Sequence, residues 1–255
     1  MPPSSDVDRL LTRSAAKTVV LADIVGCELE VRGDRLRALV LCDSERPSAA
    51  GDGELAGVLD LAAGSALAGL EALANDVRTA VLRPLLVSGR GLRCAGNDAA
   101  ALLEALRADA PAALDGWRED EEGDGFVRLS ASGTAWQPRL WVQLATTAFA
   151  AGATKALVGT RALLGEGWDA PCVNCLVDLS ETTTAVSVTQ MRGRSLRLDP
   201  ADPTKMASNW DVVCVAAGLA RAPEVSPAPC PRMASPAASV PWQPRDRRHD
   251  GASRC

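Results

Sequence analysis

Three arginines that lie close together could bind a phosphate group. Arg192, Arg194 and Arg197 fall within six residues of the segment TQMRGRSLRLDP (189–200), in a chain whose net charge is −5. A guanidinium group presents a planar fork of N–H donors that matches the oxygens of a phosphate. The ordinary alternative is a solvated helix face, on which charged side chains project into water. The cluster alone leaves both interpretations open.

The spacing of these residues predicts a common direction for them. We expect the segment TTTAVSVTQMRGRSL (182–196) to form a helix. If that helix continues to residue 197, then Gln190, Arg194 and Arg197 follow one another at i, i+4 and i+7 and lie on one face. Gly193 lies beside them and removes a side chain that could block a close neighbour.

A glycine-rich turn precedes the arginines. The segment ALVGTRALLGEGWDAPCVNCLVDLS (156–180) predicts a buried strand that ends at Thr160, a turn that contains GEGWDAP (165–171), and a second buried strand. In open parallel sheets, ligands bind at the carboxyl ends of the strands, where such turns emerge. Gly167 would let the backbone approach a ligand closely. Asp169 could accept a hydrogen bond from a ribose hydroxyl, or it could instead cap its own backbone.

Helices and short apolar strands alternate along the chain. The expected helices cover residues 14–32, 59–74, 97–108 and 140–152, and the expected strands cover residues 38–42, 82–89, 126–132, 155–160, 174–180 and 210–217. We expect Asn97 or Asp98 to cap the third helix. The acidic segment DGWREDEEGDG (115–125) is predicted to be a solvated loop. The alternation is typical of an α/β domain with a mostly parallel sheet.

The composition excludes several classes of protein. Aromatic residues make up 3% of the chain and there is no Tyr, which disfavours a surface that stacks on bases. The eight cysteines are scattered, mostly within apolar runs, as expected for reduced thiols. Cys172 and Cys175 have the spacing of metal ligands, but a second pair is missing and the single histidine, His249, lies in the tail, so we expect no metal site. No apolar run reaches the roughly 18 residues of a membrane span, and we expect a soluble, cytoplasmic chain.

The expected domain boundaries follow the composition. We expect a flexible N-terminus over residues 1–13, one α/β domain over 14–221 and a disordered tail over 222–255. Seven of the 16 prolines fall in residues 223–255, among Ala, Ser and Arg and without an apolar period. Such a segment cannot bury enough apolar surface to fold.

Two segments resemble motifs of superfamily 2 (DEAD/DEAH-like) helicases. GTRALLGEGWDAP (159–171) looks like motif V, and QMRGRSLR (190–197) looks like motif VI, Q-x-x-G-R-x-x-R. ALVLCDSE (38–45) resembles the strand that opens the second lobe of these enzymes, and the match runs in order over about residues 14–218. The resemblance implies the C-terminal RecA-like lobe, a three-layer α/β domain, of an ATP-dependent helicase or translocase.

The resemblance also implies roles for individual residues. ATP and Mg²⁺ would bind between two RecA-like lobes, and the residues that act in hydrolysis would be the arginine fingers Arg194 and Arg197 together with Gln190. The residues that contact the nucleotide would be Gly167, Asp169 and Gly193. The residues that contact the nucleic-acid backbone would be Thr160 and Arg161.

The motifs that hold Mg·ATP in the first lobe are missing from the chain. No G-x-x-x-x-G-K-[ST] string occurs, the nearest lookalike SAAKT (14–18) lacks both glycines, and no D-E-x-[HD] string follows an apolar strand. We therefore expect a chain that is inactive alone: a fragment of a longer helicase, or a lobe whose ATP and Mg²⁺ are held mainly by a first lobe in cis or in trans. The expected partner is nucleic acid, with DNA favoured over RNA. The alternatives are a non-catalytic module that binds nucleic acid or a partner lobe, and an unrelated α/β enzyme with a phosphate-binding helix.

Overall fold

The computed structural model describes residues 16–46, 64–112, 114–164, 168–180, 189 and 192–212. All of them lie in the first of two units into which the chain divides, Met1–Pro223. The expected N-terminal segment 1–13 and the expected tail 222–255 lie outside the described residues, as does the second unit, Glu224–Cys255.

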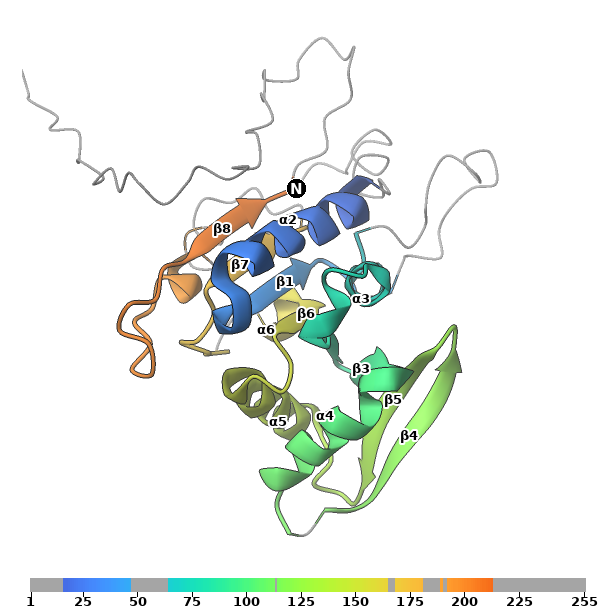
Figure 1. The fold of residues 1–255 in the computed structure, drawn as a ribbon. Coiled ribbons are helices and arrows are strands. Elements are labelled where there is room, and N and C mark those ends of the chain that lie inside the picture. Colours follow the sequence, from blue (N-terminus) through green and yellow to red (C-terminus); the bar gives the residue numbers. More distant parts are fainter. Residues whose placement is uncertain are drawn as a thin grey trace, which may run out of the picture. The chain divides into compact units, whose positions relative to one another are not determined.

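The described chain is an α/β fold built on a mostly parallel sheet of eight strands (Figure 1). The strand order is β4-β5-β3-β2-β6-β1-β7-β8. The bounds are β1 (Ala38–Cys42), β2 (Leu85–Ser88), β3 (Gly91–Ala95), β4 (Asp115–Gly123), β5 (Phe126–Ser132), β6 (Ala156–Thr160), β7 (Cys175–Asp178) and β8 (Ser208–Asp211). Strands β2, β6, β1, β7 and β8 run parallel, while β3, β5 and β4 extend the sheet through antiparallel pairs.

Helices form the outer two of three layers. The helices and short 3₁₀ turns are α2 (Ala16–Arg32), η1 (Gly33–Arg35), α3 (Ala66–Asn75), η2 (Ala80–Leu82), α4 (Gly96–Ala108), α5 (Pro138–Ala151) and α6 (Arg161–Leu164). Leu21 of α2 and Leu70 of α3 pack in one buried apolar cluster with one face of the sheet. Leu102 of α4 and Phe149 of α5 pack in a second cluster with the other face. This three-layer arrangement confirms the expected fold class and is consistent with a RecA-like domain.

The central strands follow directly from their sequences. β1 reads ALVLC, and all five of its residues are buried. Every residue of β7 is buried too, as are the first four of β6. A strand covered by helices on both faces needs apolar side chains at every position, so a continuous apolar run predicts it. The expected strands over 38–42, 155–160 and 174–180 are confirmed.

The expectation of a solvated loop over residues 115–125 is wrong. Residues Asp115–Gly123 form β4, which pairs antiparallel with β5 at the edge of the sheet. The hairpin turns through Asp124 and Gly125, whose φ angles are +54° and +79°. Most side chains of β4 are exposed, so its acidic composition resembles that of a loop. Charged residues on an edge strand also prevent it from pairing with other chains.

Two further details of this region differ from expectation. Residues Gly91–Ala95 form a strand, β3, that we did not expect. A two-residue hairpin loop at Gly89 and Arg90 folds it back onto β2. Helix α4 begins at Gly96, and Ala95 precedes it without a side-chain cap, so neither Asn97 nor Asp98 is the cap that we expected. Asp98 lies in the first turn instead, where its charge is favourable to the helix dipole.

Candidate functional site

Charged side chains gather where the parallel strands end. In register, Cys42 at the end of β1 lies beside Thr160 at the end of β6, and Leu41 lies beside Asp178 at the end of β7. Asp178 in turn lies beside Asp211 at the end of β8. The carboxyl ends of parallel strands are the usual ligand-binding edge of an α/β sheet. The predicted site residues of β6 therefore share this edge with acidic groups from its neighbours.

The two residues predicted to contact nucleic acid lie together at the end of β6. Thr160 is the last residue of β6 and is half-buried, and Arg161 opens the short helix α6. Arg161 Nη1 lies 3.9 Å from Asp43 Oδ1, which follows β1. The Nε atom of Arg161 is buried and makes no hydrogen bond within the described ranges. A long ion pair and an unused N–H leave this guanidinium able to bind an additional anion.

Asp178 is the buried acid of this edge. It is 6% exposed and accepts hydrogen bonds from the backbone N–H and the hydroxyl of Ser180, at 2.9 and 2.5 Å. Burial raises the pKa of Asp178, while the hydrogen bonds from Ser180 and the charge of Arg161 act in the opposite direction. The negative charge of Asp211 raises that pKa further.

Lys17 also reaches this edge from the first turn of α2. Its side chain is 4% exposed, and its Nζ donates a hydrogen bond to the carbonyl of Leu179 at 3.1 Å. Lys17 belongs to SAAKT, the segment that lacks the glycines of a phosphate-binding loop. This hydrogen bond connects helix α2 to the residue after β7, so the ammonium group has a structural role.

The GEGWDAP segment is fixed at its Trp. Trp168 is buried, and its Nε1 donates a hydrogen bond to Thr146 Oγ1 of α5 at 2.8 Å. Ala170 is buried as well, whereas Asp169 between them is exposed. Among the described residues of the segment, the carboxylate of Asp169 therefore lies at the surface between two buried neighbours. Gly167 lies outside the described residues.

The arginine segment (residues 192–197) is attached to β8. Ser195 is fully buried, and its hydroxyl is within hydrogen-bond distance of Asn209 Oδ1, at 2.7 Å, and of the Arg192 carbonyl, at 2.9 Å. Arg192 forms an ion pair with Asp211 at the end of β8. Arg194 is half-buried, with its Nε and Nη1 atoms shielded from solvent. Gln190 lies outside the described residues.

The helix ends earlier than the sequence predicts. The helical residues of this segment end at Ser195, and the Arg197 N–H closes a final turn by donating to the Arg194 carbonyl at 3.2 Å. Arg197 therefore lies beyond the helix, and the expected i, i+4, i+7 face is wrong at its last member.

An ion pair between described residues joins the arginine segment to the GEGWDAP segment. Arg197 Nη1 lies 2.5 Å from Asp169 Oδ1, and the two side chains are 50% and 52% exposed. Gly193 is exposed, and a Cβ built there would meet no atom within 4 Å. Among the described residues, nothing therefore crowds Gly193.

Comparisons with known proteins do not name this chain's family. Neither known family models nor curated proteins match it. The resemblance to helicases rests on the sequence motifs alone.

No group of three or more His, Cys, Asp or Glu side chains in the described ranges could hold a metal ion. No helix within those ranges is long and apolar enough to cross a membrane.

Sequence reasoning missed the acidic residues of the strand ends. Asp43 follows ALVLC directly, Asp178 ends CLVD and Asp211 ends SNWD. An acidic residue at the end of an apolar strand is a signal that could have found them, because parallel strands bring their carboxyl ends to one edge.

Proposed function

We propose that this chain is the second RecA-like lobe of an ATP-dependent nucleic-acid helicase or translocase. In this proposal the lobe supplies arginine fingers to ATP that a first lobe holds, in cis or in trans. It also contacts the backbone of the nucleic acid, with DNA favoured over RNA.

The observation that carries the proposal is the ion pair between Asp169 and Arg197. It joins the segment that looks like motif V to the segment that looks like motif VI. Both residues are half exposed, so the first lobe could reach them. The contact supports a nucleotide site that both segments share.

The chemistry of the proposed fingers is electrostatic. Arg194 and Arg197 would bind oxygens of the γ-phosphate and stabilise the charge that develops on it during hydrolysis, a role for which the guanidinium fork is suited. Arginine fingers in other nucleotide hydrolases contribute roughly 10³–10⁵ to the rate. Gln190 would couple the nucleotide to the contact between lobes. The nucleotide contacts would come from Gly167, Asp169 and Gly193.

Mg²⁺ would belong to the first lobe in this proposal. Within the described ranges, carboxylates of the strand ends do not form a group that could hold a metal ion. The guanidinium groups of the lobe fit the phosphate end of the nucleotide, and the acidic groups that hold Mg²⁺ would come from the facing lobe.

Thr160 and Arg161 would bind phosphates of the nucleic acid. A hydroxyl and a guanidinium at the end of β6 can both donate hydrogen bonds to backbone phosphates, and such contacts do not depend on base sequence. Arg161 keeps a buried Nε without a hydrogen bond in the described chain. That unused donor supports a role in binding an anion.

The isolated chain tests this proposal by fluorescence anisotropy with labelled single-stranded DNA. We expect weak binding that falls with salt, and Arg161→Ala should reduce the slope of log K against log [salt] by about 0.7–1. Arg35→Ala is the matched control, because Arg35 is exposed in η1, before the amino end of β1. We expect no ATP hydrolysis by the pure chain. Appreciable hydrolysis, or binding that Arg161→Ala leaves unchanged, would contradict the proposal.

A further inference from the structure

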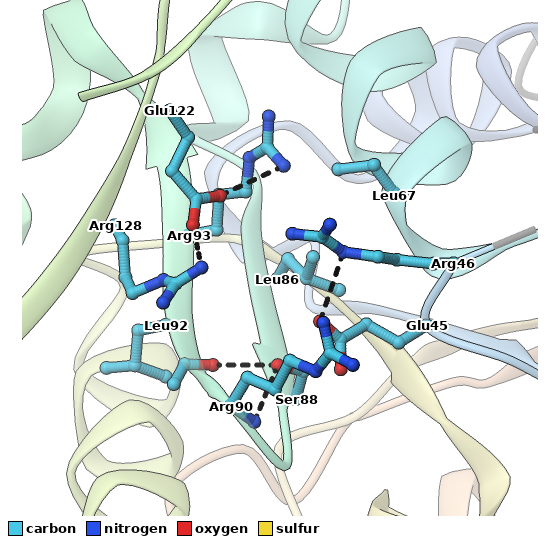
Figure 2. A pocket seen from close by; sticks show the side chains of 11 residues that line it. Glu45, Arg46, Leu67, Leu86, Ser88, Arg90, Leu92, Arg93, Glu122 and Arg128 are labelled. Carbon is cyan, nitrogen blue, oxygen red and sulfur yellow. Dashed lines mark hydrogen bonds and ion pairs between the residues drawn. The ribbon is translucent and has the colours of Figure 1, made fainter. Parts of the chain in front are cut away.

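A second group of arginines surrounds a pocket that the proposed function does not use. The pocket lies beside the β2–β3 hairpin, strand β5 and the residues that follow β1 (Figure 2), and its arginines are Arg46, Arg90, Arg93 and Arg128. Two carboxylates, Glu45 and Glu122, line it as well. Four positive and two negative groups give a net charge of +2 in a chain whose net charge is −5. We call this feature the arginine pocket.

The register of the sheet forces two of these arginines together. Arg93 of β3 lies directly opposite Arg128 of β5. Like charges that face each other across a strand pair destabilise a sheet. Glu122 of β4 lies between them and pairs with both, at 3.1 Å from Arg93 Nη1 and in close contact with Arg128 (Figure 2). One carboxylate thus serves two guanidinium groups, and the negative charges of Glu71 and Asp124 also act on Arg93.

Arg93 lines the pocket and has a buried hydrogen-bond donor that no described residue accepts. Its side chain is 11% exposed and lies over the ring of Phe126, with 5.3 Å between Cζ and the ring centroid. Its Nε is buried and makes no hydrogen bond with any described residue. Burial lowers the pKa of Arg93, Glu71 opposes that effect, and the charges of Arg46 and Arg128 reinforce it. A buried N–H without an acceptor is costly, and a bound ion or water is the usual explanation.

The remaining two arginines face the same space from the other side. Arg46 Nε lies 4.0 Å from Glu45 Oε1, which is a long ion pair. Arg90 is exposed in the hairpin loop, and its backbone N–H donates to Ser88 Oγ at 3.1 Å, which fixes the loop. Leu67, in the first turn of α3, lines the pocket, so the positive end of that helix dipole lies nearby.

We propose that the arginine pocket binds a phosphate group. Guanidinium forks from two strands and two loops surround it, and the buried Nε of Arg93 supplies a donor that needs an acceptor. The pocket also lies at the ligand-binding edge of the sheet, because Val87, next to the end of β2, pairs in register with Gly159 of β6. The phosphate belongs either to a nucleic-acid strand or to a small phosphorylated molecule, and the pocket chemistry is the same for both.

This inference stands apart from the proposed helicase function, because it requires neither ATP nor a first lobe. The test uses the full chain, with Arg90→Gln and Arg93→Gln as variants and Arg35→Gln as the matched control. Calorimetry measures the binding of inorganic phosphate at constant ionic strength, and anisotropy measures the binding of a labelled oligothymidylate. We expect each pocket variant to weaken binding about tenfold, the effect of one lost charge-assisted hydrogen bond, and the control to bind like the natural chain.

The two probes distinguish the sources of the phosphate. If the pocket variants bind only the oligothymidylate more weakly, the pocket binds a nucleic-acid strand. If they bind only inorganic phosphate more weakly, the pocket binds a small molecule. Weaker binding of both probes shows a general phosphate site. Arg93→Gln alters a buried side chain, so circular dichroism first checks its folding. Arg90→Gln lies in an exposed loop and decides the matter if Arg93→Gln does not fold. Equal binding of both probes by the natural chain and Arg90→Gln, or binding of neither probe, would overturn the proposal.

Discussion

The Arg197 guanidinium lies 2.5 Å from the Asp169 carboxylate and joins the end of the arginine segment to the GEGWDAP segment. Both side chains are about half exposed, at 50% and 52%. An exposed ion pair contributes between zero and about 1 kcal/mol to folding. In our account the pair therefore positions two functional side chains and adds little to stability.

This role predicts a small coupling energy between the two residues. Arg197→Ala and Asp169→Asn should each change the free energy of unfolding by less than about 1 kcal/mol, and a double-mutant cycle should give a coupling of about 0.2–1 kcal/mol. Urea denaturation of the natural chain, the two single variants and the double variant measures it. A coupling well above that range would show that the pair is chiefly a structural element.

Gly159 of β6 should tolerate no side chain. A Cβ at this position would lie 2.6 Å from Leu164 Cδ1 and 2.9 Å from the backbone oxygen of Val87. Because backbone cannot move away without disturbing the pairing of β6 with β2, Gly159→Ala should lower the free energy of unfolding by about 1–3 kcal/mol. Thermal or urea denaturation gives the size of the loss.

Gly193→Ala is the matched control for that substitution. Its Cβ would meet no atom within 4 Å, and alanine is the better helix former by up to about 1 kcal/mol. We expect this variant to be as stable as the natural chain or slightly more so. Equal destabilisation by the two substitutions would contradict the close packing that we describe at Gly159.

Asp178 should make stability depend on pH. Burial raises the pKa of Asp178 in the folded chain above the value of an unfolded aspartate, near 3.9. A carboxyl group with a raised folded pKa stabilises the fold below its unfolded pKa, and that contribution is lost as the pH rises through the folded pKa. Asp178→Asn should therefore be more stable than the natural chain at neutral pH, and the difference should shrink as the pH falls toward 4.

Melting temperatures across this pH range measure the effect of Asp178→Asn. Asn can still accept the hydrogen bonds that Ser180 donates, so the substitution removes mainly the charge. Asp115→Asn, on the exposed edge strand β4, shows what the loss of one negative charge does elsewhere in the chain. If Asp178→Asn is less stable than the natural chain at neutral pH, the charge of Asp178 does not destabilise the fold and this prediction is wrong.

Much of the fold could be predicted from local sequence because the central strands are apolar at nearly every position. A short run of mostly apolar residues fits neither a solvated helix nor an exposed strand. Burial in a parallel sheet therefore follows from the composition of ALVLC, ALVGT and CLVD. Thr160 and Arg161 could likewise be placed at the carboxyl edge, because they follow one of these strands.

The features that the sequence could not predict depend on tertiary pairing. β4 is as acidic as a loop, and only its register with β5 makes it a strand. The four arginines of the arginine pocket come from three separate parts of the chain, and the pairing of Arg93 with Arg128 requires the unpredicted strand β3. The contact between Arg197 and Asp169 depends on where the helix ends, which is set by the turn at Arg194 and by the attachment of Ser195 to β8.

The most direct test of the central claim is the nucleic-acid-stimulated ATP hydrolysis of the native assembly, purified through a tag on this chain. The natural chain, Arg194→Ala, Arg197→Ala and the control Arg35→Ala are compared at equal amounts of purified assembly. The account predicts that each finger variant lowers the rate by roughly 10³-fold or more, while Arg35→Ala keeps the natural rate. An assembly that hydrolyses ATP equally well with either finger variant, or that hydrolyses none with the natural chain, would contradict the claim that these arginines act on ATP.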